Sequence, residues 1–182
     1  INPLLSEAQM NLGNIYLEKE MPYEAITRYE QALAILGQNA KTFNNLGAAY
    51  MQLEQYNKAE SYYKTAISLE PDNTDAYRNL ARSYYMQDKD QIAISRLQDA
   101  LSLDPDDFES MVLLGRIYQK LNQLDKALLQ FEKVIRRAPS NTSARIALGY
   151  LLLEDNQPIA ALTHFQSVID YHGNDAQAWF GI

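Results

Sequence analysis

The stretch NLGNIY, at residues 11–16, decides the fold because close copies of it return at intervals of 34 residues. The copies are NLGAAY at 45–50, NLARSY at 79–84, LLGRIY at 113–118 and ALGYLL at 147–152. Self-similarity at a fixed period indicates a repeat protein rather than a globule around one central core. Five repeats without an insertion or deletion follow from it: 6–39, 40–73, 74–107, 108–141 and 142–175.

Small and large apolar residues recur at fixed positions, counted here from the first residue of each repeat. Position 7 is leucine and position 20 is alanine in all five repeats. Position 8 is held by Gly13, Gly47, Ala81, Gly115 and Gly149. Positions 4, 7, 8 and 11 lie on one face of a helix, and positions 20, 24 and 27 lie on one face of another. Each repeat is therefore predicted to form two amphipathic helices, which makes the protein all-α.

Helix-breaking and helix-capping residues fall where two helices per repeat require them. Proline at position 32 is expected to end the second helix, at Pro71, Pro105 and Pro139. Pro22 and Pro158 stand at position 17, where proline can open a second helix. Position 34 carries a residue suited to cap the next first helix: Asn39, Asn73, Asp107, Asn141 and Asp175.

This pattern resembles the tetratricopeptide repeat family, whose signature is W-x2-L-G-x2-Y followed by A-x3-F, A and P over 34 residues. The resemblance covers essentially the whole chain. Its weakest feature is the aromatic residue at position 4, which Phe43 and Tyr77 supply but Gln9, Met111 and Arg145 do not. The resemblance implies a right-handed superhelical solenoid of antiparallel helix pairs.

The two ends of the chain also fit the period. Residues 1–5 match the tail of a preceding repeat, with Pro3 at the helix-ending position 32. Residues 176–182 match the start of a sixth repeat, with Trp179 at position 4, where it is expected to pack against the second helix of the fifth repeat. We therefore expect the chain to be a fragment of a larger protein.

Charge and composition exclude several classes of function. The net charge is −7 without a run of basic residues, which disfavours nucleic acid as a partner. The chain has no cysteine, and no apolar stretch approaches the roughly 20 residues that would span a bilayer. We expect a soluble protein without direct membrane insertion, and the sequence leaves the cytoplasm and the periplasm open.

No pattern of residues predicts catalysis, a metal site or a cofactor. His164 and His172 lie eight residues apart, and no glycine-rich phosphate loop is present. The acidic stretch 104–109 lacks the glycine and the glutamate spacing of a calcium loop. The sequence therefore predicts a protein that is not an enzyme and that holds no metal or cofactor.

The family resemblance places peptide binding in a concave groove lined by the first helix of each repeat. Asn11, Asn45 and Asn79 share position 6 there, and Asn14 and Asn44 lie beside them. A side-chain amide offers both donors and an acceptor, so a row of amides can pair with the backbone of an extended peptide. The alternative is that asparagine is simply common at position 6 in this family.

Basic residues on the same helices suggest what such a peptide carries. Arg78 and Arg82 share one face of the third repeat, and Arg116 repeats the position of Arg82 in the fourth. They are predicted to receive an acidic segment or a C-terminal carboxylate of a protein partner. The alternative is that they pair with Asp75, Glu109 or other neighbouring acids, or are solvated.

The clamp by which some family members hold the C-terminal tails of chaperones is not matched. Its asparagines are present as Asn14 and Asn45, but Met10, Asp75 and Asn79 stand where it needs basic residues. Chaperone tails are therefore disfavoured as partners.

Apolar residues are also predicted to reach the groove, at Tyr85, Ile146 and Tyr150. Exposed apolar residues in series indicate a contact; Ile146 and Tyr150 could receive apolar side chains of a partner, or could pack beneath missing sequence or a second copy of the chain in a homodimer. The leading hypothesis is a scaffold that binds peptide segments of partner proteins. The alternatives are the substrate-recruiting domain of an enzyme such as a glycosyltransferase, and a structural or dimerisation module.

Overall fold

A computed structural model describes residues 3–172, which form ten α-helices and no strand. The helices are α1 (Pro3–Glu18), α2 (Pro22–Leu36), α3 (Ala40–Gln52), α4 (Tyr56–Leu69), α5 (Thr74–Tyr85), α6 (Asp90–Leu103), α7 (Phe108–Lys120), α8 (Leu124–Arg137), α9 (Thr142–Glu154) and α10 (Pro158–His172). The chain divides into two compact units, Ile1–Pro105 and Asp106–Ile182. The prediction of an all-α helical repeat solenoid is confirmed, and the handedness of a superhelix stays a prediction.

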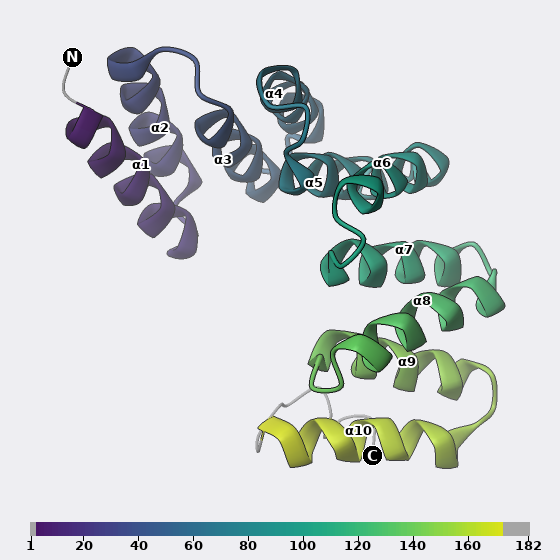
Figure 1. Cartoon of the computed structure of the whole chain (residues 1–182). Coiled ribbons are helices and arrows are strands. Elements are labelled where there is room, and N and C mark those ends of the chain that lie inside the picture. Colours follow the sequence, from purple (N-terminus) through teal and green to yellow (C-terminus); the bar gives the residue numbers. More distant parts are fainter. Residues whose placement is uncertain (1–2, 173–182) are drawn as a thin grey trace. The chain divides into compact units, whose positions relative to one another are not determined.

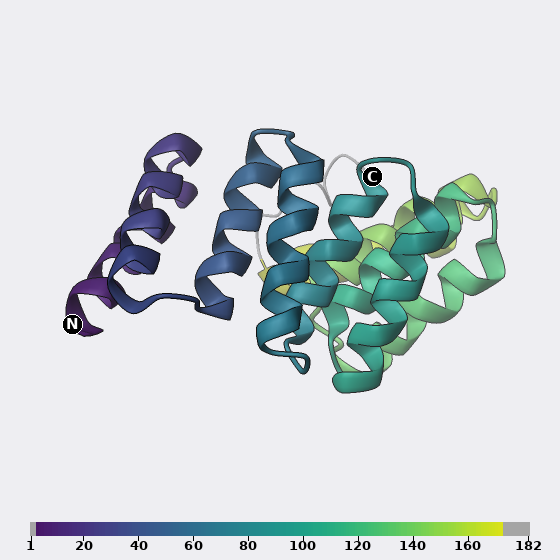
Figure 2. The same cartoon turned by 90° about the horizontal axis from the view of Figure 1, so that it is seen from above.

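In the first unit, the two helices of each repeat pack against each other: α1 on α2, α3 on α4 and α5 on α6 (Figure 1). Helix α2 also contacts α3, and α4 contacts α5, and Figure 2 shows the helices following one another in chain order. The first helices contact one another directly, α1 with α3 and α3 with α5. They therefore form one continuous layer, called here the first-helix layer.

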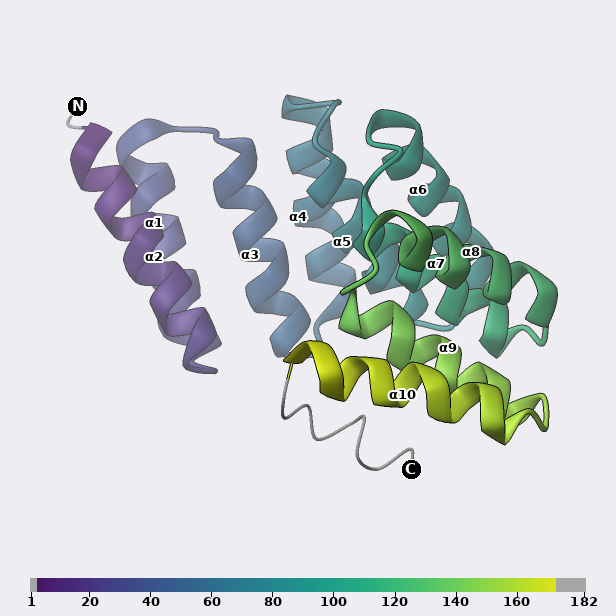
Figure 3. The same ribbon diagram turned by 60° about the horizontal axis from the view of Figure 1, so that its bottom comes forward.

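The second unit repeats this arrangement with fewer helices. Helices α7 and α8 pack together, as do α9 and α10, which lie side by side in Figure 3. Helix α8 contacts α9, and the two first helices, α7 and α9, touch directly. The repeat pattern thus places equivalent residues of the sequence on equivalent faces in each unit.

Helix boundaries agree with the breakers and caps predicted from the sequence. Every second helix begins at position 17, with Pro22 and Pro158 opening α2 and α10. Asn39 caps α3 by accepting a hydrogen bond from the Thr42 backbone N–H at 2.9 Å. The position-34 residues before α5, α7 and α9 cap in the same way. Their side-chain oxygens accept from the backbone N–H three residues later, at 3.0 Å for Asn73, 3.2 Å for Asp107 and 2.8 Å for Asn141. Side-chain capping of this kind satisfies backbone donors that have no partner inside the helix.

The N-terminal helix differs from the prediction. Pro3 was expected to end a helix of a preceding repeat, but in the structure it opens α1. Proline suits the first helical position because the N–H it lacks would have no partner there. The predictions for Trp179, for Asp175 and for a sixth repeat at 176–182 concern residues that lie outside the described range.

The core of each repeat is built around the pair of residues at positions 8 and 24. In four repeats a glycine faces a buried aromatic ring: Gly13 with Tyr29, Gly47 with Tyr63, Gly115 with Phe131 and Gly149 with Phe165. A Cβ atom on Gly47 would lie only 2.5 Å from Tyr63 Cε1. The third repeat instead combines Ala81 with the buried Leu97. A larger residue at position 8 thus accompanies a side chain without a ring at position 24.

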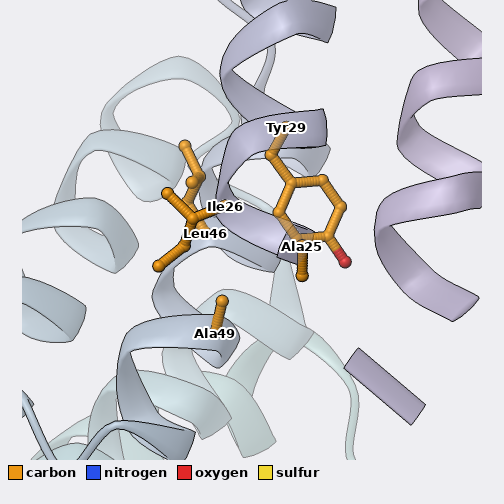
Figure 4. Packing of buried hydrophobic residues seen from close by; sticks show 5 residues of the cluster. All are labelled: Ala25, Ile26, Tyr29, Leu46 and Ala49. Carbon is orange, nitrogen blue, oxygen red and sulfur yellow. The ribbon is translucent and has the colours of Figure 1, made fainter. Parts of the chain in front are cut away.

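Neighbouring repeats share apolar contacts as well. Ala25, Ile26 and Tyr29 of α2 form one buried cluster with Leu46 and Ala49 of α3 (Figure 4). The hydroxyl oxygen of Tyr29 points away from Ile26 and Leu46, so only the ring joins the apolar cluster. The position of that hydroxyl matters for the candidate site.

Each turn between the two helices of a repeat contains one residue in the left-handed conformation. All five stand at position 15 and none is glycine: Glu20, Glu54, Asp88, Asn122 and Asn156, with φ between 55° and 58°. A side chain bearing a Cβ atom is disfavoured in this conformation. The residue types signal it only in part, because Asp88, Asn122 and Asn156 tolerate this conformation better than most side chains, whereas Glu20 and Glu54 do not mark it.

Replacing Glu54 by glycine is expected to raise the free energy of unfolding by about 0.5–1 kcal/mol. The reason is that glycine adopts φ near 56° without a Cβ clash, which outweighs its greater entropy in the unfolded chain. Chemical denaturation measures the change. The matched control is Glu30→Gly on the exposed face of α2, which should cost about 1 kcal/mol. A loss of stability in Glu54→Gly would contradict the prediction.

Candidate functional site

Four of the asparagines predicted to line the groove lie together in two pairs on the first-helix layer of the first unit. Asn45 Nδ2 donates to Asn14 Oδ1 at 2.9 Å, and Asn79 Nδ2 donates to Asn44 Oδ1 at 3.1 Å. Each pair joins neighbouring repeats. Asn11 is exposed, and its side chain forms no hydrogen bond with the described residues. The asparagines therefore link α1, α3 and α5 while their remaining donors and acceptors stay available.

Asn14 has a second partner that the sequence did not suggest. The Tyr29 hydroxyl donates to Asn14 Oδ1 at 2.8 Å, so this oxygen accepts from two donors. Burial and the negative charge of Glu18 raise the pKa of Tyr29 to about 12. The hydroxyl therefore remains a donor at neutral pH. The missed signal was that position 24 is tyrosine in the first two repeats and apolar in the other three.

Tyr63 is the counterpart of Tyr29 in the second repeat, but its hydroxyl lacks the same partner. Alanine, as Ala48, takes the place of Asn14 at position 9. The Tyr63 side chain is 2% exposed, and among the described residues its hydroxyl has no hydrogen-bond partner. Burial raises the pKa of Tyr63, and the positive charge of nearby Arg82 acts in the opposite direction. The Tyr63 ring therefore belongs to the core, and its hydroxyl differs from that of Tyr29 in having no asparagine partner.

The three arginines predicted to receive an acidic segment have different surroundings. Arg78 forms an ion pair with Asp75, which was the alternative considered for it. Arg82 is exposed on α5 and forms no ion pair with the described residues. Arg116 is likewise exposed and unpaired within residues 3–172, and it belongs to the second unit. A convergence of all three on one strip stays a prediction, and Arg82 is the exposed cation of the first unit's candidate site.

The apolar residues predicted to line the groove separate into buried and exposed ones. Ile146 is 4% exposed and packs with buried residues of α10, so its assignment to the groove is wrong. The reason is that α10 lies beside α9 and covers this position. Its buried neighbours are Ala161, Phe165 and Val168. Tyr150 is 40% exposed, and its ring makes a T-shaped contact with the Phe165 ring, with 5.4 Å between the ring centroids. Tyr85 is partly buried on α5.

Models of a known repeat family match much of the chain. The model described as Tetratricopeptide repeat matches residues 40–73, a second model of that description matches 91–148, and one described as TPR repeat matches 13–54. The chain belongs to the tetratricopeptide repeat family. The resemblance found in the sequence is thereby confirmed, and the family supports a protein-interaction scaffold in general terms. No curated protein gives a significant match.

Solved tetratricopeptide repeat structures share the fold. TTC0263 from Thermus thermophilus is 20% identical with a TM-score of 0.84, and the alignment covers 96% of this chain and 95% of that one. MamA is 26% identical with a TM-score of 0.72, and the alignment covers 88% of this chain and 94% of MamA. YrrB, described as a TPR protein with an unusual peptide-binding site, is 23% identical with a TM-score of 0.65, covering 94% and 89%. These likenesses establish the repeat architecture.

A separate hollow in this tetratricopeptide repeat protein lies in the second unit. It measures about 280 Å³ and is lined by Glu132, Ile135, Arg136, Leu148 and His164. Burial, together with the positive charge of Arg145, lowers the pKa of His164. The described residues hold no cluster of three or more potential metal ligands, and none of their helices has the length and apolarity to cross a membrane.

Proposed function

We propose that the protein is a non-catalytic scaffold whose first-helix layer, in the first unit, binds extended peptide segments of partner proteins. The observation that carries the proposal is the row of asparagines on α1, α3 and α5. Position 6 supplies one asparagine per repeat, at Asn11, Asn45 and Asn79. Because one such asparagine stands in each of the first three repeats, the amides are spaced along the layer and could contact successive parts of an extended peptide.

The hydrogen-bonding capacity of the asparagines supports this proposal. A side-chain amide has two N–H donors and a carbonyl oxygen. Asn45 and Asn79 each spend one donor on the preceding repeat, which fixes the orientation of the amide. The second donor and the carbonyl oxygen remain for a ligand. Peptide backbones offer complementary groups whatever their side chains, and YrrB shows that a protein of this fold has a peptide-binding site.

Charge narrows the class of peptide. The protein carries a net charge of −7, so its overall charge disfavours the approach of acidic chains. Arg82 is an exposed cation beside the asparagine row and is not neutralised by an ion pair with the described residues. We therefore propose that the bound segments contain a carboxylate that meets this arginine.

The proposal predicts that replacing Asn11, Asn45 and Asn79 together by alanine weakens peptide binding at least about tenfold, because each amide supplies hydrogen bonds to the backbone. Peptides are first selected on the unchanged protein from a display library of random dodecapeptides. Their affinities for both proteins are then measured by fluorescence anisotropy.

The control carries Asn57→Ala and Gln98→Ala, which remove exposed amides from the second helices α4 and α6. Thermal unfolding verifies that both variants remain folded. The control should bind the selected peptides as the unchanged protein does. Undiminished affinity of the triple variant would refute binding through the asparagine row.

A further inference from the structure

We propose that the second unit docks an acidic segment of a partner protein on its second helices, with one apolar side chain of that segment in the hollow between α8 and α10. The carboxylates of the segment meet Lys133 and Arg136 of α8. This surface belongs to a different unit and to different helices from the first-helix layer, so it does not depend on the peptide binding proposed there.

The hollow has the size of one large side chain. Its volume of about 280 Å³ is several times the space that a bound water needs. Pockets for small molecules run from roughly 300 to 1,000 Å³, so the hollow is small for a cofactor. A leucine or an aromatic side chain of a partner is therefore the occupant that its size favours.

The lining of the hollow suits an apolar group. Helix α9 contributes Leu148, which is 3% exposed, and α8 contributes the partly buried Ile135. Helix α10 contributes His164, and because burial lowers the pKa of this side chain, its ring is neutral at neutral pH. The Nδ1 atom of His164 is buried and has no hydrogen-bond partner among the described residues, so no hydrogen bond of this atom fixes the ring. The ring can therefore adjust to a side chain that enters the hollow.

Helix α8 concentrates positive charge. It carries four basic and two acidic residues, which gives it a net charge of +2 in a protein of net charge −7. None of the other second helices in the described range exceeds +1. An acidic segment is therefore attracted to this helix, although the overall charge of the protein disfavours its approach.

Lys133 and Arg136 are the cations of α8 that remain available. Arg137 forms an ion pair with Asp106, and Lys126 donates a hydrogen bond to a neighbouring glutamine. Lys133 and Arg136 are exposed, lie three residues apart on one face, and form no ion pair with residues 3–172. Because Arg136 also lines the hollow, the apolar pocket and the positive charge form one surface.

Other charged groups near the hollow leave this excess of positive charge in place. Glu132 is the acid among the lining residues, and it stands beside Lys133 and one turn before Arg136. Arg145 is already engaged, because its guanidinium lies over the Tyr171 ring at 5.5 Å from the centroid. We therefore assign the recognition of carboxylates to the two cations of α8.

Three fluorescein-labelled heptapeptides, blocked at both ends, test the surface by fluorescence anisotropy on the full chain. The first has a central leucine flanked on each side by two glutamates, the second has alanine for the leucine, and the third has glutamines for the glutamates. We expect the first to bind at least about tenfold tighter than the alanine peptide, because leucine buries more apolar surface in the hollow. It should bind about threefold tighter than the glutamine peptide, since exposed ion pairs contribute little, and this difference should shrink as salt is added.

Two variants and a matched control locate the binding. Lys133→Gln combined with Arg136→Gln should abolish the preference for glutamate over glutamine. Ile135→Phe places a larger side chain at the hollow and should reduce the preference for leucine over alanine. The control, Lys19→Gln with Lys41→Gln, removes the same charge from exposed positions of the first unit and should leave both preferences unchanged. Thermal unfolding verifies that each variant is folded, and the exposed charge variant decides the matter even if Ile135→Phe does not fold.

Docking is overturned if no peptide binds, if the leucine peptide binds no tighter than either of the others, or if the charge variant keeps the preference for glutamate. Trp179 is the only tryptophan of the chain, so a shift of its emission in Ile135→Phe would mean that the chain's own C-terminal segment occupies the hollow. Self-association that sedimentation detects and that the charge variant loses would assign the surface to a second copy. Either result would overturn docking of a partner, and neither bears on the triple asparagine variant, which tests the first unit.

Discussion

Replacing Gly47 by alanine is expected to lower the free energy of unfolding by about 1–3 kcal/mol. The added Cβ atom would stand 2.5 Å from Cε1 of the Tyr63 ring, which is 2% exposed. Helix propensity alone would favour alanine over glycine by about 1 kcal/mol. If urea denaturation shows a lower free energy of unfolding, the clash between α3 and α4 outweighs the gain in helix propensity.

The third repeat provides the control for this prediction, because it already combines alanine at position 8 with leucine at position 24, as Ala81 and Leu97. The double variant with Gly47→Ala and Tyr63→Leu should lose less stability than the sum of the two single variants. Additive losses would mean that the ring does not cause the effect. The reverse change, Ala81→Gly, creates no clash and should cost about 1 kcal/mol through helix propensity.

Sequence periodicity predicted the helices well because each repeat is one local unit whose boundaries are marked by its own residues. Asn39 and Pro22 show this, since each acts on the helix it adjoins. Pro3 shows the limit, because the same residue can end one helix or open another, and the period alone does not tell which. The left-handed residue at position 15 was missed because no repeat has glycine there and the glutamates of the first two repeats do not mark the conformation.

The candidate site was predictable only in part, because it depends on contacts between repeats. Asn45 was recognised from its position, but its bond to Asn14 depends on how α3 lies against α1. Tyr63 was assigned to the core from its position, and its 2% exposure agrees with that assignment. Ile146 was placed in the groove by its position on the first helix, although α10 buries it. Position within a repeat predicts the face of a helix, whereas burial also depends on the neighbouring helix.

Replacing Phe131 by alanine is expected to have the largest effect on stability, a loss of about 3–5 kcal/mol. The ring is fully buried between α8 and the glycine face of α7. Gly115 has no side chain that could move into the resulting cavity, so the lost contacts would not be replaced. In a repeat protein each repeat is stabilised mainly by its own contacts and by those with its neighbours. Hydrogen exchange should therefore show the greatest loss of protection in α7 and α8.

The control for this variant lies two residues away on the same helix. Leu129 is 47% exposed, so Leu129→Ala removes an apolar side chain from the same helix without opening a cavity. It should change the free energy of unfolding by less than about 0.5 kcal/mol. Equal losses in the two variants would contradict the assignment of Phe131 to the core. An even loss of protection over all helices of the second unit would contradict the expectation that each repeat is stabilised mainly by its own contacts. The second unit would then unfold as one cooperative block.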